Sequence, residues 1–299
     1  MGVSRWLRRF AWATLVANVA LVVTGGAVRL TGSGLGCPTW PRCNGGSFTP
    51  HGTIGPHQLI EFGNRTLTFI LVAIAVATFV AARQSGRRDL LRLSVVLGLA
   101  IPAQAVLGGI TVLTDLNPWV VSFHLLLSLA IVSVAVLFLH RLDHPPTPPA
   151  RGMVPALAWT TYAVTWLVLY AGTVVTGSGP HAGDASSPRN GLDPLQLSQL
   201  HADLVFLLIG LTVGMWFALR ATGGDIRPVT ALAAIEVLQA TVGFVQYFAG
   251  LPVAVVMLHM LGAALVVAAA TWLLVTVLEP APIRESSLWG TLGGASDGR

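Results

Sequence analysis

The chain has 299 residues, of which 54% are hydrophobic and only 10% are charged, whereas soluble domains carry about 25% charged residues. A mean hydropathy of +0.74 excludes an ordinary soluble fold. The net charge of +5 does not indicate a nucleic-acid-binding protein, because the basic residues lie in loops between apolar runs. We predict an all-α, polytopic membrane protein.

Eight apolar stretches are each long enough to cross a bilayer, which takes about 20 helical residues. In chain order, we predict spanning helices over 9–28, 57–82, 91–113, 119–140, 154–176, 196–219, 228–249 and 252–278. We interpret the first as a retained helix, because no small-residue cleavage site follows a short apolar core. The Pro-rich stretch 145–149 separates the first four from the last four.

The predicted organisation has an N-terminal half over 9–140, a linker over 141–153, a C-terminal half over 154–278 and a tail over 279–299. Short motifs recur between the halves: the Thr-Gly-Ser-Gly of 31–34 returns at 176–179, Gln104 returns as Gln239, and His124 returns as His259. Such recurrence is typical of an internal duplication. We therefore expect two pseudo-symmetric four-helix bundles, each made of transmembrane helices.

Orientation follows from the arginines, since the chain has no lysine. Thirteen of the 17 arginines fall on the side of both termini, and four, Arg29, Arg42, Arg65 and Arg189, fall on the other side. Cytoplasmic loops carry the excess of basic residues. We predict a multi-pass protein of the bacterial cytoplasmic membrane with both termini and the 279–299 tail in the cytoplasm, and with the long loops 29–56 and 177–195 facing outward.

Both cysteines, Cys37 and Cys43, lie in the first of these outer loops. An outward loop is an oxidising place in which disulfides persist. We expect the pair to form a disulfide that staples the loop, which we favour over a redox-active role. A small ring can be labile, so the redox alternative stays open.

Three histidines, His124, His201 and His259, lie inside the predicted spans, one to two turns from the outer ends. Histidine in hydrocarbon is costly and is usually functional or paired. The spans of His201 and His259 both run from outside to inside, so the two imidazoles lie at similar heights. Two neutral imidazoles across a four-helix bundle are suited to axial ligation of a haem iron. A pair of interhelical hydrogen bonds is the alternative.

The first half is less symmetric, because Asn64 occupies the position that corresponds to His201. Glu61 lies one turn earlier, near the height of His124, and Arg65 follows Glu61 at four residues' distance and can hold its carboxylate ionised. A carboxylate beside a cofactor with one firm protein ligand indicates chemistry, whereas the bis-histidine half indicates electron transfer. A structural ion pair near the membrane surface is the alternative for Glu61 and Arg65.

Other polar residues in or near the spans have weaker assignments. Arg29, at the outer end of the first span, could contact a haem propionate or extend to the lipid headgroups. Glu236, Gln239 and Asp203 could bind the Nδ1 atoms of histidines, or could make interhelical contacts. The match to Gln239 draws attention to Gln104.

With these residues in hand, the chain resembles the haem A synthase family over about 10–280. The resemblance is carried by Gly-Gly-Ala-Val-Arg-Leu-Thr-Gly-Ser-Gly-Leu at 25–35, by the outer cysteine pair Cys37 and Cys43, and by Ile-Glu-Phe-Gly-Asn-Arg at 60–65. His124, His201 and His259 stand where the family places its ligands.

The resemblance implies an eight-helix protein with pseudo-twofold halves and a haem b held by His201 and His259. It implies that the first half binds haem O, with iron on His124, and oxidises the C8 methyl group to a formyl group by successive hydroxylations with water as the oxygen source. Glu61 matches the family's catalytic glutamate. The resemblance also implies haem A as product, and haem O synthase and cytochrome oxidase assembly proteins as partners, besides membrane lipid. Homo-oligomer formation is left open.

One departure from the family concerns the substrate site. The usual motif is Glu-x-x-His-Arg, and Asn64 stands here in the place of the histidine. Either His124 alone holds the substrate iron, or another group such as His57 approaches. His57 lies two turns above Asn64, about 10 Å along the helix axis, which is too far for a direct replacement.

Two other functional classes fit part of the pattern. A non-catalytic di-haem membrane cytochrome that exchanges electrons with quinone explains the histidines but gives no role to Glu61. A transporter with inverted repeats is disfavoured, because each half has four spans and starts on the same side.

Overall fold

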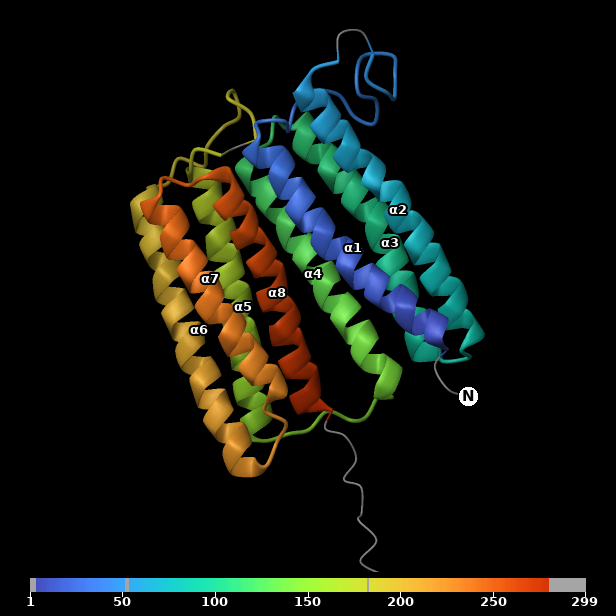
Figure 1. The fold of residues 1–299 in the computed structure, drawn as a ribbon, viewed down its shortest axis with the longest axis vertical. Coiled ribbons are helices and arrows are strands. Elements are labelled where there is room, and N and C mark those ends of the chain that lie inside the picture. The colour runs from blue at the N-terminus through green and yellow to red at the C-terminus, as the bar shows by residue number, and fades with distance from the viewer. Residues whose placement is uncertain (1–3, 52–53, 182, 280–299) are drawn as a thin grey trace, which may run out of the picture.

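The structure, a computed structural model, describes residues 4–51, 54–181 and 183–279, and within these ranges it consists of helices joined by loops (Figure 1). The helices are α1 (Arg5–Leu30), α2 (Pro56–Gln84), α3 (Arg88–Leu113), α4 (Pro118–Asp143), α5 (Met153–Ser178), α6 (Pro194–Thr222), α7 (Arg227–Phe248) and α8 (Val253–Leu278). All eight are long and apolar enough to cross a membrane. Each predicted span coincides with one of them, so the all-α fold with eight spanning helices is confirmed.

Local sequence explains where several helices begin. Pro56, Pro118 and Pro194 stand in the first turns of α2, α4 and α6, where proline loses no helical hydrogen bond and its fixed φ suits the helix. The side chains of Asn117 and Asp193 accept hydrogen bonds from first-turn N–H groups of α4 and α6. The helices that start beneath the outer loops therefore have well-defined upper ends.

The helices pack as two neighbouring rings of four. In the first ring α1 contacts α2, α2 contacts α3, α3 contacts α4, and α4 returns to α1; α5 to α8 form a second ring in the same order. The rings meet through α1, α4, α5 and α8, as Figure 1 shows at the centre of the molecule. Whether a pseudo-twofold axis relates the rings, and whether they act as separate domains, stay predictions.

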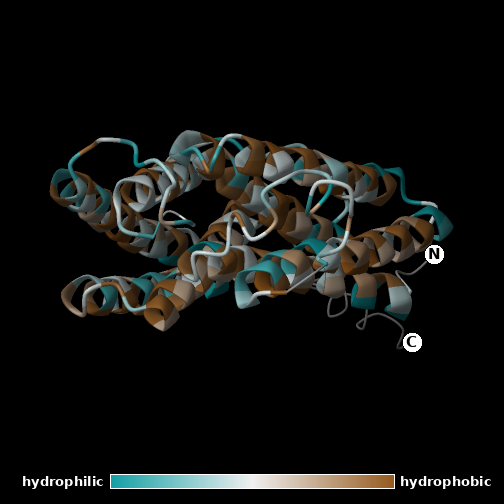
Figure 2. Ribbon diagram, turned by 90° about the horizontal axis from the view of Figure 1, so that it is seen from above, coloured by the Kyte–Doolittle hydropathy of each residue, from teal (hydrophilic) through white to brown (hydrophobic). Residues whose placement is uncertain are grey.

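Apolar packing joins the rings as well as filling them. Small and branched residues from the four central helices form a buried cluster between the rings: Val22, Leu129, Val132, Leu169, Ala264 and Val267. The outer helix faces are also apolar (Figure 2), with Phe69 75% exposed and Phe206 62% exposed. A bundle that is apolar both inside and outside is suited to lipid rather than water.

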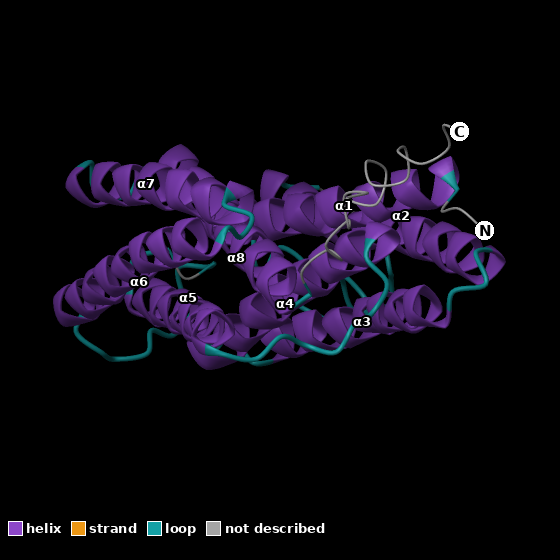
Figure 3. Ribbon diagram, turned by 90° about the horizontal axis from the view of Figure 1, so that it is seen from below, coloured by secondary structure: helices purple, strands orange, loops and turns teal. Residues whose placement is uncertain are grey.

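The two ends of the bundle differ in charge. α1 begins and α8 ends at the lower end in Figure 1, the end that faces the viewer in Figure 3. That end carries most of the arginines in the described ranges: Arg5, Arg8, Arg9, Arg83, Arg87, Arg88, Arg92, Arg141, Arg151, Arg220 and Arg227. The upper end carries the two long loops. Of the predicted 279–299 tail, only Glu279 lies inside the described residues.

Candidate functional site

The second ring brings two imidazoles together. His201 in α6 and His259 in α8 have ring centroids 6.5 Å apart, with ring planes inclined by 70°. Both residues belong to helices that run away from the long-loop end, which explains their similar height. The structure thus places side by side the two histidines that the sequence singled out.

A backbone hydrogen bond fixes the tautomer of one of them. The Nδ1 atom of His201 lies 3.1 Å from the carbonyl oxygen of Val168 in α5. Because a carbonyl can only accept, Nδ1 carries the proton, and Nε2 keeps its lone pair. A neutral imidazole oriented in this way through its second nitrogen is the form that binds metals.

Each imidazole lies against a glycine of a neighbouring helix. A Cβ atom at Gly172 of α5 would stand 3.1 Å from Cε1 of His201, and one at Gly243 of α7 would stand 3.3 Å from Cε1 of His259. These separations are shorter than ordinary carbon contacts. Glycine at both positions therefore leaves the space that the rings occupy.

The donor set fits a haem iron. The ring separation leaves room for one metal ion with a metal–nitrogen bond of about 2 Å on each side, and a porphyrin supplies the remaining four ligands. In the described part of the chain, no group of three or more His, Cys, Asp and Glu residues is gathered for a bare metal ion. The Nδ1 atom of His259 is buried and finds no hydrogen-bond partner there. The pair thus suits a metal that brings its own equatorial ligands.

The first ring repeats part of this arrangement around His124 of α4. A Cβ at Gly108 of α3 would stand 3.3 Å from Cε1 of His124, as at Gly243 and His259. Nε2 of Gln104 donates to the carbonyl oxygen of His124 over 3.3 Å, and Nε2 of Gln239 donates to that of His259 over 2.7 Å. The recurrence in sequence is therefore also a recurrence of contacts.

These contacts decide between the two roles that the sequence left open for the intramembrane polar residues. Gln104 and Gln239 bind the backbone of the histidines rather than Nδ1. Glu236 accepts a hydrogen bond from the hydroxyl of Thr212 in α6 over 2.9 Å, and Asp203 is exposed. The Nδ1 contacts suggested for Glu236, Gln239 and Asp203 are wrong, because Gln239 and Glu236 bind groups on neighbouring helices and Asp203 is exposed. The interhelical alternative holds for Gln239 and Glu236, and Gln104 makes the same kind of contact as Gln239.

No second imidazole faces His124 from the position of Asn64. Within the described ranges, the buried Oδ1 atom of Asn64 has no hydrogen-bond partner. His57 lies at the start of α2, where its Nδ1 atom is 2.9 Å from the hydroxyl of Ser33. The first ring therefore offers one firm imidazole ligand.

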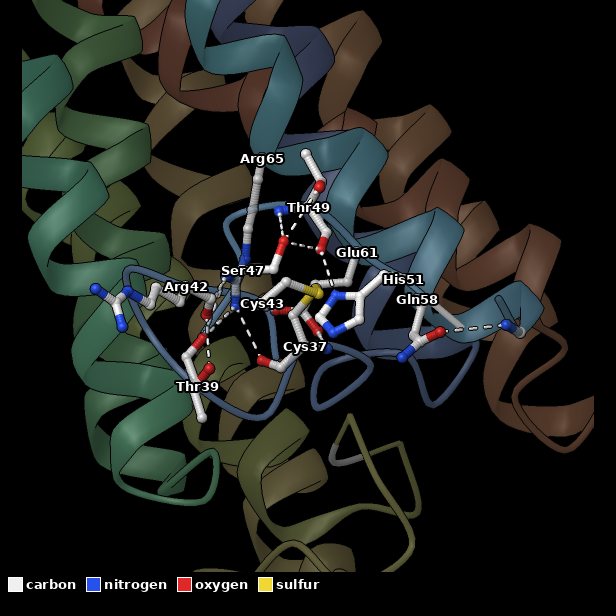
Figure 4. Close-up of a disulfide and its surroundings, with 11 residues drawn as sticks. Cys37, Thr39, Arg42, Cys43, Ser47, Thr49, His51, Gln58, Glu61 and Arg65 are labelled. Carbon is white, nitrogen blue, oxygen red and sulfur yellow. Dashed lines mark hydrogen bonds and ion pairs between the residues drawn. A yellow bond between two sulfur atoms is a disulfide. The ribbon is translucent and has the colours of Figure 1, made fainter. Parts of the chain in front are cut away.

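Glu61 is the most buried acid of the first ring, with 5% of its surface exposed. Oε1 accepts a hydrogen bond from Arg65 over 2.5 Å, so the ion pair expected from the i,i+4 spacing is confirmed. Oε2 accepts from the backbone N–H of Cys37 over 2.6 Å (Figure 4). A carboxylate held by a guanidinium and a backbone amide is stabilised in its ionised form.

The predicted disulfide between Cys37 and Cys43 is present, and the loop around it is tied to α2. Arg65 donates to the carbonyl oxygens of Cys37 over 3.0 Å and Thr39 over 3.3 Å (Figure 4). Glu61 binds the same loop from the same helix. The acid, the guanidinium and the disulfide loop therefore form one connected unit.

Sequence reasoning missed Trp40, which lies between the two cysteines. A Cβ atom at Gly109 of α3 would overlap the Trp40 indole. Gly109 follows Gly108, which lies against His124, so the indole packs on α3 at the level of the predicted substrate site but on a different face of the helix. A tryptophan inside a six-residue disulfide spacing is the signal that could have drawn attention to it.

Arg29 of α1 reaches across to the second half. Its Nε atom donates to the carbonyl oxygen of His181 over 2.7 Å, and Nη2 donates to that of Thr176 over 3.1 Å. The side chain thus turns toward the neighbouring ring rather than to the headgroups. Among described residues, none accepts a hydrogen bond from its Nη1 atom, which leaves a donor for a carboxylate.

Eight apolar helices, a facing imidazole pair in one ring, and one imidazole and a buried carboxylate in the other ring define a multi-pass membrane protein with the donor set of a haem protein. The family model of the cytochrome oxidase assembly proteins COX15-CtaA matches residues 8–54 and 53–188. These ranges cover more than half of the chain, and the chain belongs to this family.

Individual relatives agree with the family. A protein of Lysinibacillus sphaericus named Heme A synthase is 28% identical over 277 residues, which cover 86% of this chain and 88% of the relative. A Heme A synthase of Geobacillus kaustophilus is 25% identical, with coverage of 73% and 71%. The resemblance recognised from the motifs is confirmed.

Proposed function

We propose that the chain is a haem A synthase that oxidises the C8 methyl group of haem O to the formyl group of haem A for cytochrome oxidase assembly. The observation that carries the proposal is that the two helix rings contain different sets of polar side chains. One holds a facing pair of imidazoles, and the other holds one imidazole, His124, and a buried Glu61 that is paired with Arg65. The relatives named Heme A synthase support the same activity.

In the second ring, His201 and His259 hold a haem b. Support comes from the proton on Nδ1 of His201, which leaves Nε2 as a ligand atom. Gly172 and Gly243 also leave space for the imidazoles of His201 and His259. The bound haem supplies one-electron transfer between the substrate and an outside acceptor.

In the first ring, His124 ligates the iron of haem O, with Asn64 lining the same site. Arg65 binds Glu61 and holds it in place, and the Nη1 atom of Arg29, which has no acceptor among the described residues, would bind a propionate. Substrate lies between α2 and α4, so its methyl group approaches Glu61 rather than the second ring.

Glu61 stabilises positive charge that develops at the methyl carbon as electrons leave, or it takes a proton from the attacking water. Each hydroxylation joins one water oxygen to the carbon and releases two electrons and two protons. After the second hydroxylation, the geminal diol loses water and leaves the formyl group.

We infer that the arginine-rich end faces the cytoplasm, since loops on that side carry the excess of basic residues. The imidazoles and Glu61 then lie in the outer part of the bilayer. The disulfide loop is placed outside, where oxidation maintains it.

The experiment is a pigment analysis of the purified protein with Glu61→Gln. We expect this variant to retain haem b and to accumulate haem O without haem A, because glutamine cannot carry the negative charge. Glu236→Gln changes the other buried glutamate and should leave haem A formation near normal. Haem A production by Glu61→Gln at the wild-type rate would contradict the role of Glu61.

A di-haem membrane cytochrome is the second candidate, favoured by the matching glycine and glutamine contacts of His124 and His259. Pigment extraction from the wild-type protein separates the two functions. Haem O or haem A beside haem b supports the synthase, whereas haem b alone supports the carrier. A colourless preparation would exclude both and return attention to a transporter.

A further inference from the structure

A cavity lies far from the candidate haem ligands, at the arginine-rich end of the bundle. It has a volume of about 710 Å³ and is bounded by the ends of α4, α6 and α8, the start of α5 and the α6–α7 turn. Thr276, on its wall, follows His259 by 17 residues of α8, which corresponds to about 25 Å along the helix. The proposed reaction therefore makes no use of this cavity.

Both acidic side chains on the cavity wall, Asp225 and Glu279, are paired with arginines, which leaves Arg151 as the unpaired charge on the described part of the wall. Arg227 binds Asp225 over 2.7 Å and holds the pKa of the Asp225 carboxyl below its ordinary range through these hydrogen bonds. Arg141 binds Glu279 over 2.5 Å. Arg151, on the cavity wall, has no acidic partner among the described residues. An anion is the ligand that this arrangement favours.

His140 supplies a buried polar group on the same wall. Its side chain is only 5% exposed, and Nε2 lacks a hydrogen-bond partner within the part of the chain that the structure describes. The nearest acidic oxygen, Oε2 of Glu279, is 3.7 Å away, beyond hydrogen-bond distance. The ring of His144, also on the wall, stacks on His140 with centroids 4.4 Å apart. Buried polar atoms normally have a partner, so a ligand oxygen in the cavity would complete this site.

The start of α5 adds backbone donors. Its N-cap residue, Gly152, lies on the cavity wall and has no side chain to cap the helix. The first N–H groups of a helix and its dipole attract anions, phosphate in particular. Arg151 and the α5 N-terminus therefore present charge and hydrogen-bond donors to the same space.

Most of the rest of the wall is apolar and includes Met153, Leu219 and Trp272, with Thr222 and Thr276 among them. Met153, the first residue of α5, is 90% exposed, and Trp272, in the last two turns of α8, is 38% exposed. An anionic site that opens beside exposed apolar side chains suits an amphipathic ligand better than a free ion. We propose that this cavity binds an anionic phospholipid, with its phosphate at Arg151, His140 and the α5 N-terminus and its acyl chains along Met153 and Trp272.

The test compares lipid retention by native mass spectrometry, with protein purified in detergent and given equal amounts of phosphatidylglycerol and phosphatidylcholine. Wild-type protein should retain phosphatidylglycerol preferentially. Arg151→Gln should retain about fivefold less of it, since one arginine near an anionic lipid contributes about that factor. Arg88→Gln is the matched control, because Arg88 is exposed at the same end of the bundle but away from the cavity.

A second variant, His140→Gln, should also reduce retention, and the haem absorption of each variant reports whether it has folded. Excess inorganic phosphate separates a lipid from a free anion. Retention that resists phosphate supports a phospholipid, and displacement by phosphate overturns it. Equal retention by Arg151→Gln and Arg88→Gln, or no preference for phosphatidylglycerol, would also overturn the proposal.

Discussion

At the scale of single residues, the positions of three imidazoles depend on glycines in neighbouring helices, which have no side chain. Gly172, Gly243 and Gly108 each leave a space that a histidine ring fills. Three histidines thus have the same kind of seat, although only two of them face each other. The seats restrict ring orientation without using a polar side chain.

Gly243→Ala tests one of these seats. The added methyl group would crowd Cε1 of His259, and overpacking of this kind costs about 1–3 kcal/mol. We expect haem b affinity to fall roughly tenfold or more, measured by haem titration of the apoprotein. Gly210→Ala, where nothing lies within 4 Å, should bind haem normally. Equal haem content in both variants would show that the seat is unimportant.

Asn64→His tests the asymmetry between the rings. The variant places an imidazole at the position that corresponds to His201, in place of an amide whose buried Oδ1 atom has no partner among the described residues. We expect the purified variant to retain several-fold more haem O relative to haem b, with the spectrum of a six-coordinate iron. An unchanged pigment ratio would mean that this position does not approach the substrate iron.

The residues of the candidate site stood out in the sequence, whereas only some of their partners could be predicted from it. His201, His259 and Glu61 stood out because ionisable side chains inside the hydrocarbon region are costly and usually serve a function. Arg65 was predictable as a partner of Glu61 from helical spacing alone. Cys37 was not, because its N–H reaches Oε2 only through the path of an irregular loop, which no periodicity encodes.

At the scale of elements, the outer loop and α2 act as one unit. The disulfide closes a short loop, and Glu61 and Arg65 bind that loop at the backbone of Cys37. The spans themselves could be predicted from apolar length, because eight long runs admit few alternatives. The loop that orients Glu61 could not, since its shape depends on tertiary contacts such as Trp40 against Gly109.

Replacing both Cys37 and Cys43 by serine tests this unit. A disulfide that closes so short a loop stabilises the protein by about 2 kcal/mol. The backbone N–H of residue 37, which is bound to Glu61, should therefore exchange roughly thirtyfold faster in the variant. Hydrogen–deuterium exchange measures this rate. Haem A formation should fall with it, because Glu61 loses a fixed donor. Retained protection in the double variant would show that Glu61 and Arg65 hold the loop without the disulfide.

At the scale of the whole molecule, the two rings are joined by apolar packing in the middle and by Arg29 at the upper end. Arg29 binds two carbonyl groups of the second half, and hydrogen bonds to a charged group contribute about 1.5–3 kcal/mol each. The packing of α1, α4, α5 and α8 holds the rings together; Arg29 fixes how their outer loops meet.

Arg29→Gln should therefore lower the temperature at which half of the haem is released, measured by absorbance during heating. Arg83→Gln, with an exposed side chain at the opposite end, should leave that temperature unchanged. If both variants release haem at the wild-type temperature, the upper contact between the halves contributes nothing to cohesion. If Arg29→Gln releases haem at the wild-type temperature but binds less substrate haem than Arg83→Gln does, the main role of Arg29 is to bind a propionate.

The first outer loop is fastened on three sides: to α2 through Glu61 and Arg65, to α3 through Trp40, and to the second loop through the hydrogen bond from Gly34 N–H to the carbonyl oxygen of Gly183, 2.9 Å long. If the chain binds haem O as proposed, entry of the flat porphyrin from the aqueous end would have to break these contacts. Entry between helices from the lipid would leave them intact.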